Sequence, residues 1–252
     1  ALAIVDVYRM RGPAALRRTE RVLALDPSHA KAYHVLNMLH LTLGRPKEAL
    51  KYAERAVALS PLSPENQVGL AWAALAVGDN ERGFRAARRR REIEPEYHGT
   101  YLEGYALYRL GKLTERDTVV SEGVRRLLLA LEEVTVGNEA PVRKLLERYQ
   151  KKRNDPGYRT DLSHVSFRIG LLQAALGQRA EAISTFEAAF EEQEWSGGGQ
   201  AIRLRYFYPD VLGPLRRDPR WEELMRSINV GWGLNPDGSL PEETGRTQTS
   251  TR

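Results

Sequence analysis

The sequence contains no cysteine, which excludes disulfide bonds, thiolate metal sites and a cysteine nucleophile. It also lacks an uninterrupted apolar run of the ~20 residues that a membrane helix needs, because the longest candidate, 124–136, contains charged residues. No signal peptide is recognisable. We therefore expect a cytoplasmic protein without a membrane-spanning segment.

The sequence signatures of common enzymes are missing as well. There is neither a GxSxG motif nor a GxxxxGK[ST] phosphate loop, and the glycines at 197–199 are typical of a linker. The five histidines have no metal-site spacing; His34 and His40, for example, lie on different faces of one helix. We expect no catalytic activity, no metal and no cofactor.

Lysine is scarce, since arginine supplies most of the 38 basic residues of a chain with a net charge of +5. Arginine is the better donor to carboxylates and phosphates. The same composition also fits a GC-rich genome or a hot habitat, so composition alone does not identify a partner.

The most informative pattern that is present is a repeat. Pro27, Pro61 and Pro95 are spaced by 34 residues, Gly44 and Gly78 keep the same spacing, and residues 14–27 align with 48–61. A period of this length predicts helix–turn–helix units that bury their apolar faces only by stacking. We therefore expect an all-α protein, a right-handed α-solenoid whose concave face binds other chains.

Apolar spacing places the helices of these units. The first complete unit should contain helices at 30–43 and 47–59, and the next unit should begin with a helix at 64–77. Another first helix, 97–110, should end at Gly111.

These units resemble the tetratricopeptide repeat. The positions that fit in the first complete unit are Tyr33, Leu36, Gly44, Ala49, Ala53, Ala56 and Pro61, and those in a second clear copy, 162–192, are Gly170, Gly177, Ala182, Phe186 and Ala189. The segment 112–161 is degenerate. We expect helices at 114–135 and 139–153 there, with Asn138 as N-cap, and one degenerate unit, because Gly111 and Gly177 are two periods of 33 apart.

The chain divides into four parts. The array should cover 1–194 and be followed by a linker (195–200), a C-terminal capping segment (201–232) and a disordered tail (233–252). The first unit is incomplete at Ala1, so we expect a longer protein to continue ahead of it. PLRRDPRW (214–221) resembles the closing phrase of tetratricopeptide arrays in bacterial multidomain regulators, which implies that the array belongs to such a signalling protein.

The capping segment carries apolar residues at helical spacing: Val211, Leu212, Leu215, Trp221, Leu224, Met225 and Ile228. We expect them to fold onto the last repeat, with Trp221 as the largest buried contact. The alternative is an exposed Trp221 that serves a partner.

In tetratricopeptide arrays the concave face is lined by the first helix of each unit. The resemblance therefore implies a partner-binding set of Lys31, His34, Met38, Trp72, Tyr101, Tyr105, Tyr108 and Arg109. The tyrosines face the groove if their unit is aligned on Gly111 and the core if it is aligned on Pro95. A clamp for an acidic C-terminal peptide is not supported, because Met38 stands where an asparagine would be needed.

An arginine run, Arg85 and Arg88 to Arg91, occupies a second helix. It could contact phosphates, but a solvated outer face paired with Glu92 and Glu94 is the favoured interpretation. The sequence thus predicts a non-catalytic scaffold that binds a protein or peptide. The alternative is an oligomerisation or assembly subunit, and we do not expect nucleic-acid binding.

Overall fold

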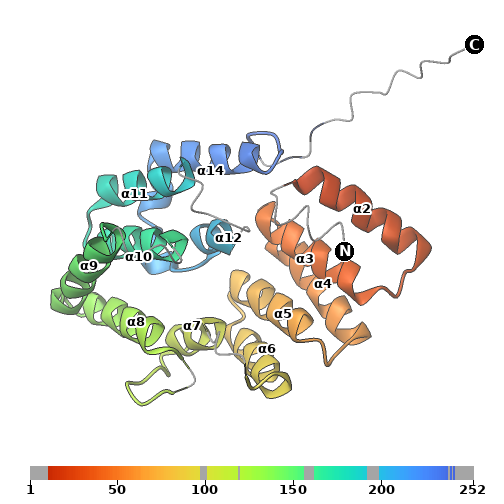
Figure 1. Ribbon diagram of the computed structural model, residues 1–252, viewed down its shortest axis with the longest axis horizontal. Helices are drawn as coiled ribbons and strands as arrows, with labels where there is room; N and C mark the ends of the chain where they lie inside the picture. Colours follow the sequence, from red (N-terminus) through yellow and green to blue (C-terminus); the bar gives the residue numbers. More distant parts are fainter. Residues whose placement is uncertain are drawn as a thin grey trace, which may run out of the picture.

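The computed structural model describes residues 11–96, 101–118, 120–155, 162–191, 199–237, 239 and 241. Within these ranges all the regular secondary structure is helical, so the predicted all-α solenoid is confirmed. The helices are α2 (Gly12–Leu25), α3 (Ala30–Thr42), α4 (Pro46–Leu59), α5 (Pro64–Ala76), α6 (Asn80–Ile93), α7 (Tyr101–Arg109), α8 (Glu122–Thr135), α9 (Ala140–Arg153), α10 (Leu162–Ala175), α11 (Arg179–Glu191), α12 (Gly199–Tyr206), α13 (Pro209–Leu212), a 3₁₀ turn (Leu215–Arg217) and α14 (Pro219–Gly231). They are arranged as a ring around α12 (Figure 1).

The regular units α3–α4, α5–α6 and α10–α11 turn at a glycine. Gly44, Gly78 and Gly177 have φ angles of +77°, +84° and +74°, a left-handed conformation that suits glycine. In each turn the next residue donates its N–H to a carbonyl five positions back, as Arg45 does to His40 at 2.8 Å. The local glycine signal therefore fixes where each first helix ends.

The middle unit is shorter than the sequence predicted. α8 begins at Glu122 instead of 114, because Thr114 donates both its N–H (2.6 Å) and its hydroxyl (2.8 Å) to Asp117 and forms a turn. Val120 then packs onto α7, where a Cβ on Gly104 would lie 2.6 Å from it. One side chain thus fills the place that a second helix normally fills.

The shortened unit changes the frame. Gly137, with a φ of +87°, ends α8 as the other turn glycines end the first helices, so α8 and α9 form the next pair. Gly137 therefore divides the interval between Gly111 and Gly177 into two units of unequal length, instead of the two equal periods of 33 residues that the sequence predicted. Asn138 is not the N-cap expected there: Glu139 precedes α9, and the Asn138 amide donates to Glu133 at 2.9 Å.

α14 is the predicted capping helix. Trp221 is buried with its ring edge-on to Phe186 of α11, at 6.0 Å between centroids. The other end of α14 reaches α2, where the N–H of Gly12 donates to the carbonyl of Trp232 at 3.0 Å. α14 therefore joins the last repeat to the first described helix, as Figure 1 shows. Trp232 is even more buried than Trp221 (1% against 4% exposed).

The C-terminal boundaries also differ from the expected division. α12 includes Gly199, at the end of the expected linker, whereas 195–198 lie outside the described residues. Leu234 is buried against the fold, and Asn229 donates to the carbonyl of Pro236 at 2.9 Å. The expected tail thus starts with packed residues because Leu234 has an apolar site to fill. Residues 1–10 and 242–252 lie outside the described part.

Candidate functional site

The concave face carries the aromatic residues that the sequence singled out. α7 ends at Gly111, with a φ of +64°, in the same way as α5 ends at Gly78. The alignment on Gly111 is therefore the correct one, and it places Tyr101 on the same face as Trp72, with 6.4 Å between ring centroids. Tyr105 lies next to Tyr101 at 6.1 Å.

This face is occupied by the chain itself. Residues 199–217, here called the plug segment, comprise α12, α13 and the 3₁₀ turn and lie inside the ring of helices (Figure 1). The fully buried ring of Phe207 stacks on Tyr105 at 4.3 Å and on Trp72 at 5.0 Å. Such pairs are stabilising beyond the area that they bury. The sequence predicted Trp72 and Tyr105 as members of a partner-binding set but did not predict their contact with Phe207.

Arg203 of the plug segment supplies a cation to the same aromatic cluster. Its guanidinium lies 4.1 Å from the ring centroid of Tyr101 and 5.7 Å from those of Trp72 and Phe167. Aromatic faces attract cations at such distances. Aromatic side chains from three first helices, α5, α7 and α10, therefore surround the guanidinium of Arg203.

Tyr208 adds hydrogen bonds to this stacking. Its backbone is left-handed, with a φ of +52°, and its N–H donates to the Tyr105 hydroxyl at 2.9 Å. Its own hydroxyl lies 2.8 Å from that of Tyr101. Burial raises the pKa of Tyr101, Tyr105 and Tyr208, so these groups stay neutral hydroxyls at ordinary pH.

Further contacts hold the middle of the plug segment and its own fold. The Tyr206 hydroxyl donates to the carbonyl of Leu41 in α3 at 3.0 Å. Arg109 pairs with Asp210 at 2.8 Å on the rim, beside Tyr108. Arg216 donates to two carbonyls of the segment itself, those of Leu204 and Phe207, at 3.1 Å each. The segment is therefore a folded insert.

The predicted partner-binding residues fall into two groups. Trp72, Tyr101 and Tyr105 form the slot, with Tyr108 and Arg109 at its edge. Lys31 is exposed on α3, while His34 and Met38 are half-buried. Burial lowers the pKa of His34.

Arg203, Phe207 and Tyr208 were not predicted from the sequence as part of this site. The only local signal was the aromatic run 206–208 ahead of a proline, which we assigned to the capping segment.

The arginine run lies on the outer face and is largely ion-paired. Arg91 donates twice to the buried carboxylate of Glu103, at 3.0 Å each. Arg88 and Arg89 reach Glu92 at 3.3 and 3.1 Å. The pairs of Arg88 and Arg89 with Glu92 fit the predicted solvated face, whereas Arg91 pairs with a buried carboxylate.

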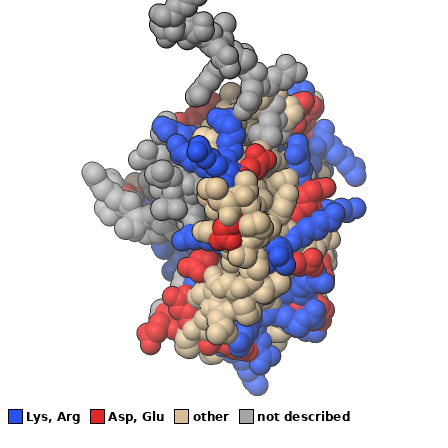
Figure 2. All heavy atoms as spheres, turned by 90° about the vertical axis from the view of Figure 1, so that its right-hand side faces the viewer, with Lys and Arg blue, Asp and Glu red and all other residues tan. Residues whose placement is uncertain are grey.

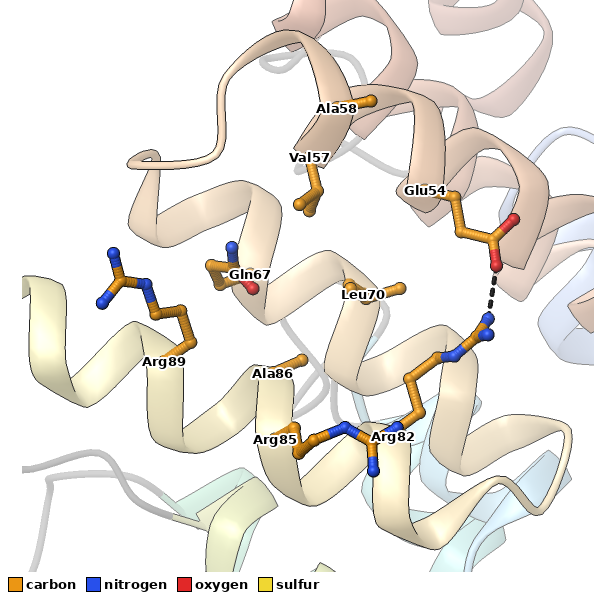
Figure 3. A pocket seen from close by; sticks show the side chains of 9 residues that line it. All are labelled: Glu54, Val57, Ala58, Gln67, Leu70, Arg82, Arg85, Ala86 and Arg89. Carbon is orange, nitrogen blue, oxygen red and sulfur yellow. Dashed lines mark hydrogen bonds and ion pairs between the residues drawn. The ribbon is translucent and has the colours of Figure 1, made fainter.

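Nearby, a hollow of about 510 Å³ lies between α4, α5 and α6 (Figure 3). Its lining consists of Glu54, Val57, Ala58, Gln67, Leu70, Arg82, Arg85, Ala86 and Arg89.

Within the described ranges, no group of acidic or histidine side chains is arranged to hold a metal ion. A search of the same residues finds no helix with the length and apolar character to cross a membrane.

One comparison with known proteins, that with family models, agrees with the repeat pattern. The family model described as "Tetratricopeptide repeat" matches residues 30–61 and 163–194, which correspond to α3–α4 and α10–α11. No curated protein sequence matches the chain. Among solved structures, "Crystal structure of MamA" is similar at 19% identity, covering 73% of this chain and 89% of that one with a TM-score of 0.38.

Proposed function

Because the chain is a tetratricopeptide repeat protein, a fold of protein-interaction scaffolds, we propose that its concave groove receives a short segment of a partner protein. In the isolated chain the plug segment occupies that groove. The observation that carries the proposal is the position of Phe207 between Trp72 and Tyr105. A groove that accepts this insert has the shape and chemistry to accept a similar segment from another chain.

The groove chemistry defines the class of ligand. Trp72 and Tyr105 offer a slot for one aromatic ring, and the face of Tyr101 offers a site for a cation. The Tyr105 hydroxyl accepts a backbone N–H. The preferred partner segment therefore carries an arginine four residues before an aromatic residue, the spacing of Arg203 and Phe207.

The remaining predicted residues extend the same surface. Tyr108 and Arg109 line the rim, and we assign Lys31, His34 and Met38 of α3 to contacts beyond the aromatic slot. The closing phrase 214–221 supports a place for this scaffold within a larger regulatory protein. The groove would then connect that protein to its partner.

The test uses the plug segment as its own probe. A labelled peptide with the sequence of residues 199–217 is titrated into the unmodified chain and into Arg203→Ala/Phe207→Ala, and binding is followed by fluorescence anisotropy. We expect saturable binding to the double variant and little to the unmodified chain, since a tethered segment competes at millimolar effective concentration or about that.

The matched control is the same peptide with its own Arg203 and Phe207 replaced by alanine. Circular dichroism confirms that the double variant remains helical. Equal binding of both peptides, or no binding of the parent peptide to a folded double variant, would contradict the proposal.

A further inference from the structure

The hollow on the outer face has one cationic wall. Arg82, Arg85 and Arg89 of α6 line it together. Their spacing of three and four residues places them on one side of the helix, along about 10 Å of its axis. These three side chains, here called the arginine row, extend from one side of α6 beside the hollow, as Figure 3 shows.

The opposite wall and the floor are mostly apolar, apart from Glu54 and Gln67. Val57 and Ala58 come from α4, Leu70 from α5 and Ala86 from α6. Ala53 and Ala56 of α4 are buried, and their small side chains let α4 and α5 approach closely. A ligand in this hollow thus meets methyl groups on one side and arginine on the other.

The arginine row retains unused positive charge. Arg82 is paired with Glu54, the one acidic residue lining the hollow, and also lies 3.3 Å from Asp79. Arg89 shares Glu92 with Arg88. Arg85 is exposed and has no ion-pair partner among the residues that the structure describes. Each guanidinium has five donors, so the row can accept further carboxylates.

The surrounding surface has the same mixed character. Figure 2 views the side of the molecule on which α2 and α4 lie in Figure 1, and uncharged residues there form a band bordered by Lys and Arg. Asp and Glu also lie along this border. This side of the molecule is thus not uniformly basic.

We infer that the hollow binds an acidic, amphipathic segment of a partner protein, with carboxylates on Arg85 and Arg89 and an apolar side chain over Val57 and Leu70. The apolar wall favours such a segment over a nucleic acid, whose phosphate backbone offers it no apolar group. This site is lined by the second helices α4 and α6 and by Gln67 and Leu70 of the first helix α5, and none of its residues belongs to the concave groove. It is independent of the proposed function.

The test measures binding of a defined probe to the full chain. The probe is a fluorescein-labelled helical peptide with glutamates along one stripe and leucines along the next. Its twin carries lysine in place of every glutamate. We expect the acidic peptide to bind and the lysine peptide not to bind. Added salt should weaken the binding, because exposed charges are screened.

The double substitution Arg85→Ala/Arg89→Ala should lower the affinity for the acidic peptide about tenfold, because each exposed contact contributes a factor of roughly two to five. Arg88→Ala is the matched control, because Arg88 lies on the same helix but does not line the hollow. It should leave the affinity within about twofold. Leu70→Asp tests the apolar wall and should also weaken binding.

Three results would overturn the inference. One is the absence of acidic-peptide binding up to about 1 mM, the weak end of specific recognition. Another is an equal loss in Arg88→Ala and in Arg85→Ala/Arg89→Ala. The third is tighter binding of a short DNA duplex that is lost in the double variant, which would assign the arginines to phosphate. If the plug-segment peptide fails to bind the concave groove, the inference about the hollow still stands, because the groove and the hollow share no residue.

Discussion

The two faces of this solenoid are built from the same repeats but have opposite chemistry. First helices supply the concave face with the rings of Trp72, Tyr101 and Tyr105, and the chain's own Phe207 fills the space between them. Second helices supply the outer face with alanines and arginines, and its hollow is open. A filled face stabilises the fold, whereas an open face is free to contact other molecules.

The difference follows from what each face can bury. Aromatic rings on a concave surface converge, so one inserted ring contacts several of them at once. Arginines on a convex surface diverge and are hydrated, so their ion pairs contribute little to stability. Substitutions on the concave face should therefore change the free energy of unfolding much more than substitutions on the outer face.

The largest effect is expected for Phe207→Ala. Removing a fully buried aromatic side chain leaves a cavity among Trp72, Tyr101 and Tyr105. The free energy of unfolding, measured by urea denaturation, should fall by about 3–5 kcal/mol. Arg89→Ala on the outer face is the comparison and should change it by less than about 0.5 kcal/mol. Similar effects of the two substitutions would abolish the distinction between the faces.

The second-largest effect is expected at alkaline pH, which should lower the free energy of unfolding through the buried tyrosines of the plug segment. Burial raises the pKa of Tyr206 to about 12, and the same cause raises that of Tyr208. In the unfolded chain a tyrosine loses its proton near pH 10. The unfolded state then binds fewer protons than the folded state, so stability is lost as pH rises above 10.

For Tyr206 alone the loss is at most about 1.4 kcal/mol per pH unit between pH 10 and pH 12, reduced by its partial exposure. Urea denaturation from pH 9 to pH 11.5 measures the slope, and Tyr206→Phe should make it shallower. An unchanged slope in Tyr206→Phe would show that this hydroxyl titrates normally in the folded chain.

A smaller effect is expected for Tyr105→Phe. The substitution keeps the ring that stacks on Phe207 but removes the hydroxyl that accepts the Tyr208 N–H. A buried N–H without a partner costs about 1–3 kcal/mol. Tyr33→Phe removes an exposed hydroxyl, which donates to the Pro27 carbonyl at 3.1 Å, and should cost clearly less in the same denaturation assay. The reverse order would show that Tyr208 is not held by this bond.

The smallest effect on the concave side is expected at its rim. Arg109→Ala removes the ion pair with Asp210, whose carboxylate is largely exposed. The expected loss is about 0.2–1 kcal/mol and should disappear in high salt. A loss above 2 kcal/mol (about twice that range) would mean that Arg109 closes the groove, and thermal denaturation at two salt concentrations tests this.

The sequence predicted the regular units within a residue or two because their signals are local. Gly44 requires a left-handed turn and Pro46 starts α4, so both helix boundaries follow from neighbouring residues. The start of α8 could not be predicted in the same way. It depends on the Asp117 turn and on Val120 finding Gly104 across the fold.

The same limit applies to the candidate site. The repeat predicted a concave-face position for Trp72, and for Tyr105 only if its unit is aligned on Gly111; it did not predict the occupant of the groove. Phe207 and Tyr208 follow a glycine-rich stretch, and no local pattern states which face such a segment will cover. Their place is determined by long-range contacts, such as the Tyr208 N–H on Tyr105.

Hydrogen exchange of the unmodified chain tests the central claim, occupation of the concave groove by the plug segment, most directly. The amides of Phe207, Tyr208 and Leu212 donate at 2.9, 2.9 and 2.8 Å, those of Phe207 and Leu212 within the segment and that of Tyr208 to Tyr105. Peptides covering 204–213 should therefore exchange far more slowly than an unstructured peptide. Exchange of 204–213 at the rate of an unstructured peptide, with α10 still protected, would contradict it.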